Sequence, residues 1–84
     1  MTNLLARVLV DICIFLETAD DSVLDPDAAV RTLETLAYRL RALSSADRHA
    51  LASAMRAIAD VEPAHRELVL HLPQSLGLED ESGD

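Results

Sequence analysis

The chain has 84 residues and a formal net charge of −8, from 15 carboxylates and seven basic side chains that are all Arg. Half of the residues are apolar, yet only Phe15 and Tyr38 are aromatic, and there are just two Gly and three Pro. This composition predicts a single all-α domain, a compact bundle of four helices, because a β meander needs more turn residues. The acidity disfavours nucleic acid as a partner, since phosphates carry the same charge.

The single cysteine, Cys13, cannot form an internal disulfide, which is typical of a reducing compartment. The first residues lack the basic start of a secretory leader, and Arg7 and Asp11 interrupt the apolar run that follows. A membrane-spanning helix needs about 20 apolar residues in a row. We therefore expect a cytoplasmic protein that does not bind a membrane.

The first predicted helix covers residues 3–19 and is apolar on almost every side. One face has Leu4, Leu5, Val8, Leu9, Ile12, Leu16 and Ala19, and the others add Val10, Cys13, Ile14 and Phe15. Three short neighbouring helices cannot easily cover so much apolar surface. The sequence therefore predicts a contact with a second copy or another protein through Val10, Ile14 or both.

Helix-start signals precede the second and third predicted helices. Asp25 and Pro26 fit the cap and the first position of a helix over residues 26–43. Ser44 and Asp47 give the S-x-x-D start of a helix that runs to about residue 61. Both helices have an apolar stripe at helical spacing, as expected for a small bundle.

The last predicted helix covers residues 64–72, because Pro73 is expected to stop it. A final turn then places Gly77 in the left-handed conformation, with Leu76 and Leu78 packing back on the core. Residues 79–84 are predicted to be a disordered acidic tail. The domain assignment is a helical bundle over residues 1–78 and a tail over residues 79–84.

Charge is divided unevenly along the chain. Residues 11–27 contain six carboxylates and no base, whereas residues 31–56 contain five Arg against Glu34 and Asp47. Residues four apart share a helix face, which predicts ion pairs within helices. The expected pairs are Asp27–Arg31, Arg56–Asp60 and Glu62–Arg66.

No motif indicates an enzyme, a metal or a cofactor. The Asp20–Asp27 cluster lacks the Gly and the late Glu of a calcium loop, and His49, His65 and His71 lack the spacing of ligands on one helix face. Nothing in the chain has a nucleophile elbow or a Gly-rich phosphate loop. Residues 40–58 can also be interpreted as a helix-turn-helix that presents Arg48, His49 and Arg56 to DNA.

The run from Leu43 to Ala59, with its Ser44, Asp47, Met55 and Ile58, and the ending Leu72–Leu78 resemble small bacterial proteins of GC-rich genomes. In size, acidity and helix count the chain is also similar to the small immunity proteins that inhibit basic nuclease toxins. That resemblance implies a four-helix inhibitor of a basic protein. It assigns no inhibitory residue, because those inhibitors use a tyrosine pair and Tyr38 is the only tyrosine here.

These observations favour a non-enzymatic protein-interaction module, an inhibitor or immunity-type partner of a basic protein. The alternatives are a homodimeric accessory or structural subunit and a helix-turn-helix DNA-binding regulator. The residues predicted to contact the partner are Val10, Ile14, Glu17, Asp20, Asp21, Glu34 and Tyr38.

Overall fold

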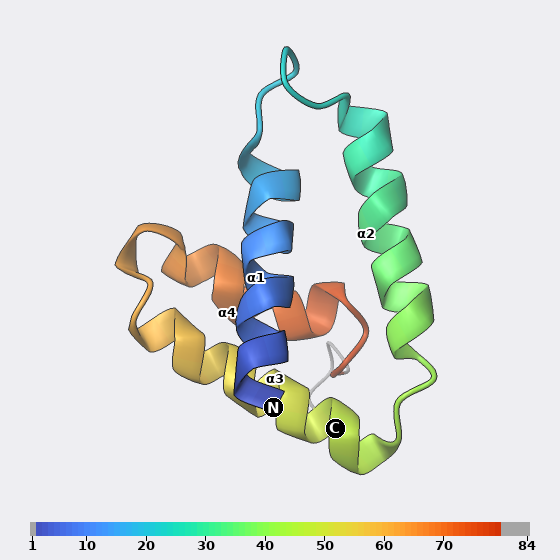
Figure 1. The fold of residues 1–84 in the computed structure, drawn as a ribbon, viewed down its shortest axis with the longest axis vertical. Helices are drawn as coiled ribbons and strands as arrows, with labels where there is room; N and C mark the ends of the chain where they lie inside the picture. The colour runs from blue at the N-terminus through green and yellow to red at the C-terminus, as the bar shows by residue number, and fades with distance from the viewer. Residues whose placement is uncertain (1, 80–84) are drawn as a thin grey trace.

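The computed structural model describes residues 2–79, which form four α-helices and no strand. The helices are α1 (Thr2–Thr18), α2 (Pro26–Leu40), α3 (Ser45–Asp60) and α4 (Arg66–Ser75), with a short 3-10 helix η1 (Pro63–His65) before α4. Helices α3 and α4 form an antiparallel hairpin, and α1 lies across it (Figure 1). The prediction of an all-α bundle is confirmed.

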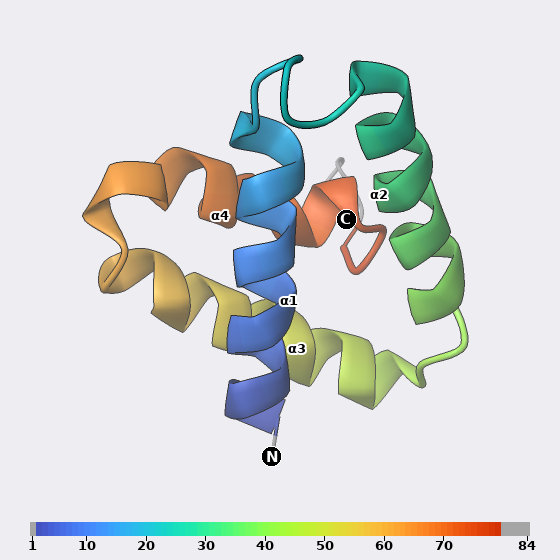
Figure 2. The ribbon, with the colours of Figure 1, turned by 45° about the horizontal axis from the view of Figure 1, so that its top comes forward.

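Helix α2 stands at the side of this three-helix unit. It packs against α1 and makes little contact with α3 or α4, and the turned view shows it standing apart from the hairpin (Figure 2). Ala29 is its only buried residue, whereas Leu33, Leu36 and Leu40 on its inner face are half-buried. The tightly packed part of the molecule is therefore α1, α3 and α4.

The core lies where α1 crosses the hairpin. Its central cluster is Ala6, Val10, Cys13, Leu51, Ala52, Met55, Ala59, Val69, Leu72, Leu76 and Leu78. The residues from α1 in this cluster are small or of medium size, so the helix can approach α3 and α4 closely. Met55 fills the centre because its unbranched side chain adapts to an irregular space.

Both predicted helix caps are present. The Asp25 carboxylate accepts a hydrogen bond from the Ala28 amide at 3.2 Å, and Pro26 is the first residue of α2. The Ser44 hydroxyl accepts one from the Asp47 amide at 3.1 Å. Each cap satisfies a backbone donor that has no partner within the first turn of the helix.

The end of α2 and the start of α4 differ from the prediction. Helix α2 ends at Leu40 instead of residue 43, because i→i+3 bonds tighten the chain over Arg41, Ala42 and Leu43 before the Ser44 cap. Residues 63–65 form the 3-10 helix η1, so α4 begins two residues later than expected.

The prediction that Pro73 stops the last helix is wrong, since α4 continues to Ser75 with Pro73 inside it. A proline at this place removes one backbone donor, but its ring is completely buried in the core. Its carbonyl also accepts the amides of Leu78 at 2.8 Å and Glu79 at 3.2 Å. Burial and these bonds offset the lost hydrogen bond.

Gly77 has the predicted left-handed conformation, and it lies in the turn that closes α4. Its φ is 73°, and the Gly77 amide bonds Gln74 while the Leu78 amide reaches back to Pro73, which together form a Schellman motif. Leu78 is buried, and Glu79 forms an ion pair with Arg56. Glu79, the first residue of the predicted tail, therefore lies against α3, and residues 80–84 lie outside the described residues.

Candidate protein-interaction surfaces

The outer face of α1 carries a stripe of large apolar side chains, here called the α1 stripe. Its members are Leu4, Leu5, Val8, Ile12 and Phe15, which are 44–66% exposed. All five lie within about 100° of the helix circumference at 100° per residue. A row of large exposed apolar side chains along one helix face often marks a protein interface.

The predicted contact residues on α1 lie on the other side of the helix. Val10 is completely buried in the chain's own core, and Ile14 is half-buried against it. The prediction of excess apolar surface on this helix holds, but Val10 offers no surface to a partner in this fold. The smaller residues Ala6, Val10 and Cys13 turn inward because α1 crosses α3 and α4 closely, which leaves the bulkier residues outside.

One edge of the α1 stripe is charged. The Arg7 guanidinium lies 3.1 Å from the Asp11 carboxylate and 2.7 Å from that of Glu62, in the connection after α3. The hydrogen bond to Glu62 is the main cause that raises the pKa of Arg7, although partial desolvation opposes it. This edge therefore presents a fixed positive charge between two negative ones.

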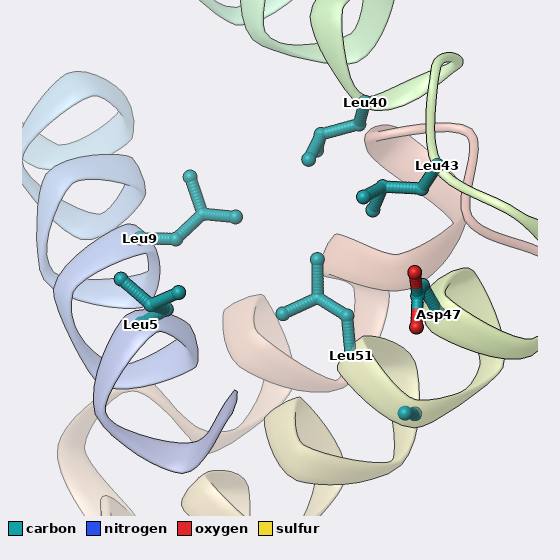
Figure 3. A pocket seen from close by; sticks show the side chains of 7 residues that line it. Leu5, Leu9, Leu40, Leu43, Asp47 and Leu51 are labelled. Atoms are coloured by element: carbon teal, nitrogen blue, oxygen red, sulfur yellow. The ribbon is translucent and has the colours of Figure 1, made fainter. Parts of the chain in front are cut away.

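An apolar groove opens at the other edge of the α1 stripe (Figure 3). It has a volume of about 350 Å³ and lies between α1, the end of α2 and the start of α3. Its lining is Leu5, Leu9, Leu40, Leu43, Ala50 and Leu51, with Asp47 on one side. Leucine side chains from three segments point into this space. Asp47 is the one titratable residue among those that line it, so the groove offers no pair of groups for acid–base catalysis.

A second depression, of about 300 Å³, lies where α1 ends and α2 begins; we call this region the acidic end. The buried residues of its lining, Leu16 and Ala29, are apolar and form its floor, whereas Glu17 and Asp21 are exposed and contribute the carboxylates of its rim. The lining residues are Leu16, Glu17, Ala19, Asp21, Leu24, Pro26, Ala29, Val30 and Leu33. An apolar floor under carboxylates suits a Lys or Arg side chain, whose stem is apolar and whose head is cationic.

Asp20 stabilises the loop beside the acidic end. Its carboxylate accepts hydrogen bonds from the Ser22 amide at 3.0 Å and the Ser22 hydroxyl at 2.5 Å. These bonds lower the pKa of Asp20 below its usual value. This residue holds the turn and adds negative charge without lining the depression.

Glu34 and Tyr38, also predicted to contact the partner, lie elsewhere. They line a shallow depression on the outer face of α2 together with Arg31, Thr35 and Arg39. The structure thus brings Glu17, Asp20 and Asp21 together and separates them from Glu34 and Tyr38.

The ion pairs predicted within helices are replaced by others in residues 2–79. Arg56 pairs with Glu79 instead of Asp60, and Arg66 lies 3.2 Å from Asp60 instead of pairing with Glu62. The Asp27–Arg31 pair is not formed within 4 Å. The packing of α4 against α3 brings carboxylates close to Arg56 and Arg66, and these pairs cannot be predicted from spacing along a single helix.

Helix α3, the DNA-reading helix of the helix-turn-helix interpretation, packs into the core through one of its faces. Four of its residues, Leu51, Ala52, Met55 and Ala59, are buried against the rest of the molecule. The Arg48 side chain is half-buried, with an Nε atom that is buried and without a hydrogen-bond partner, and Arg56 is engaged by Glu79. Arg56 would therefore have to leave its ion pair with Glu79 to reach a base edge.

Within residues 2–79, no three His, Cys, Asp or Glu side chains are grouped as they would be to hold a metal ion. His49 and His71 are exposed and His65 is half-buried, each on a different helical element. None of the helices in this part of the chain has both the length and the apolar character to cross a bilayer.

Comparison of the chain with protein-family models, curated proteins and solved structures finds no match.

Proposed function

We propose that this chain is a non-enzymatic protein-binding module that captures a basic protein at its acidic end, in the manner of an inhibitor or immunity-type protein. The observation that carries the proposal is the depression with an apolar floor and a rim that includes Glu17 and Asp21. A Lys or Arg of the partner would place its stem on the floor and its charge against the rim.

The surrounding charge supports the same partner. No basic residue occurs between Arg7 and Arg31, while six carboxylates do, so the field at this end attracts cations and repels phosphates. Such a field accelerates encounter with a basic protein and makes the association rate sensitive to salt.

The test compares two double variants with the same net charge. Glu17→Gln/Asp21→Asn removes the rim carboxylates, and Asp60→Asn/Glu67→Gln removes two exposed carboxylates from the distal part of the α3–α4 hairpin. Proteins captured by the wild-type chain are identified by mass spectrometry, and their affinity for all three chains is measured by titration at several salt concentrations.

We expect the rim variant to lose at least tenfold in affinity for the captured basic protein and the control variant to stay within about twofold. Equal binding by both variants, or capture of acidic proteins only, would refute the acidic end as the binding site. A mobility-shift titration with duplex DNA tests the regulator alternative, for which salt-sensitive binding is the required result.

A further inference from the structure

The α1 stripe is a second surface, distinct from the acidic end, and the spacing of its residues points to its occupant. The spacings between four members of the stripe are three, four and three positions, for Leu5, Val8, Ile12 and Phe15. This series of spacings is the same whether the helix is followed from its N-terminus or from its C-terminus. The midpoint of this series is position 10. An antiparallel copy of α1 would therefore place Leu5 opposite Phe15 and Val8 opposite Ile12.

We propose that the α1 stripe is the interface of an antiparallel homodimer of this chain. The area fits such a contact: with exposures of 44–66%, the five side chains offer roughly 500 Å² per copy. The two stripes of a dimer would together bury about 1,000 Å². Residues that flank the stripes would add to this area and bring the total close to ~1,200 Å², the lower end for specific interfaces. Interfaces at this lower end are typical of weak, reversible association.

The charges around the stripe select the antiparallel order. Arg7 and Asp11 lie on the same edge, and a two-fold axis across the helix places the Arg7 of each copy within about one turn of the other's Asp11. The acidic ends then lie at opposite ends of the interface. A parallel pair would bring both acidic ends together, where their carboxylates repel.

The apolar groove adjoins the α1 stripe. Leu5 belongs both to the stripe and to the lining of the groove, so the interface ends at the mouth of the groove on this side. The dimer leaves both acidic ends open, one at each extremity, and is compatible with capture of a basic protein at either.

Sedimentation of the full chain over a wide concentration range tests the dimer. We expect a monomer–dimer equilibrium for the wild type and a monomer for Val8→Glu. Val61→Glu is the matched control, because Val61 is 73% exposed and lies outside the stripe, and it should still dimerise. Circular dichroism shows whether both variants keep the fold. A wild type that remains monomeric at millimolar concentration, or equal loss in both variants, would overturn the proposal.

The order of the two helices is tested by disulfide formation in a Cys13→Ala background. An equal mixture of Leu5→Cys and Phe15→Cys chains should form a covalent heterodimer, whereas Leu5→Cys alone should not, since its two thiols lie about 15 Å apart along the axis. Efficient cross-linking of Leu5→Cys alone would refute the antiparallel order. Failure of the dimer leaves the Glu17/Asp21 titration unaffected, so the two proposals fail separately.

Discussion

At the scale of single residues, Asp25 is the cap on which the start of α2 depends. Asp25→Ala removes the acceptor for the Ala28 amide and should lower the free energy of unfolding by about 0.5–2 kcal/mol. Thermal unfolding followed by circular dichroism measures the change. Asp21→Ala is the control, because this carboxylate lies in the same loop without capping a helix. Equal midpoints for Asp25→Ala and wild type would contradict the capping role.

Cys13 illustrates how burial alters a thiol. Its side chain is completely buried, and desolvation, with a smaller effect of Glu17, raises its pKa to about 11. The thiolate is the reactive form, so the native chain should resist a thiol reagent at pH 8 and react rapidly once unfolded by denaturant. Fast labelling of the native chain would show that α1 does not hold this residue in the core.

The same shift gives the stability a defined dependence on pH. The pKa is higher in the folded state than the usual value of 9.0, so the neutral thiol stabilises the fold fully below pH 9. That stabilisation is lost progressively between pH 9 and about pH 11, where only the unfolded state ionises. Chemical denaturation across this range should show a steeper decline for wild type than for Cys13→Ala, whose cavity lowers stability by a pH-independent amount. The same pH dependence of stability in wild type and Cys13→Ala would show that the pKa of Cys13 is not raised by folding.

At the scale of elements, the turn after α4 depends on the backbone of Gly77 rather than on space around it. Its φ is 73°, and a Cβ built there meets no atom within 4 Å. Gly77→Ala should therefore cost only the backbone penalty of about 1 kcal/mol. Gly77→Asn should cost less, because Asn tolerates the left-handed conformation better than Ala. Thermal unfolding of both variants measures the two penalties. An Ala variant as stable as wild type would show that the left-handed conformation of Gly77 carries no backbone penalty.

The local signals in the sequence were sufficient to predict the starts of α2 and α3 and the left-handed turn at Gly77. Asp25, Ser44 and Gly77 act through bonds to residues within a few positions, so their chemistry is visible in a short window of sequence. Pro73 was misleading because its cost is offset by burial of its ring against residues far away in the chain. A rule based on neighbouring residues cannot predict this burial, because the contacts of the Pro73 ring come from distant parts of the chain.

The interaction surfaces could be predicted only in part, for a similar reason. The apolar excess of α1 is evident from its composition, but a helix that is apolar all round does not specify which side is covered. The close crossing of α1 over the α3–α4 hairpin turned Val10 inward and left Val8 and Ile12 outside. Likewise the apolar groove and the depression at the acidic end are made by segments distant in sequence.

At the scale of the whole molecule, charge is distributed over more than the acidic end. Removing residues 80–84 takes away three carboxylates and changes the net charge from −8 to −5. Because the core lies within residues 2–79, the thermal midpoint should not change. Association with a basic partner should become slower and less dependent on salt. Stopped-flow rates at low and high salt measure this.

The shortened chain also tests the opposite view of the central arginines. If their normal role were to bind DNA, removal of the acidic tail should reveal tight, salt-sensitive binding in a mobility-shift titration. We expect no shift with either form, because the shortened chain is still acidic and Arg56 is engaged by Glu79, which the truncation retains.

The lateral position of α2 implies that the molecule does not open as one cooperative unit. This helix packs almost exclusively on α1, and a single one of its residues is buried, so few apolar contacts oppose its detachment. Native-state hydrogen exchange should therefore find that α2 amides exchange through a local opening that costs far less free energy than global unfolding. The amides of α3 and α4 should exchange only through the global event. In the detached state the α1 side chains that face α2, among them Leu9 and Leu16, become exposed beside the α1 stripe, so the apolar surface of the opened chain is larger than that of its native form.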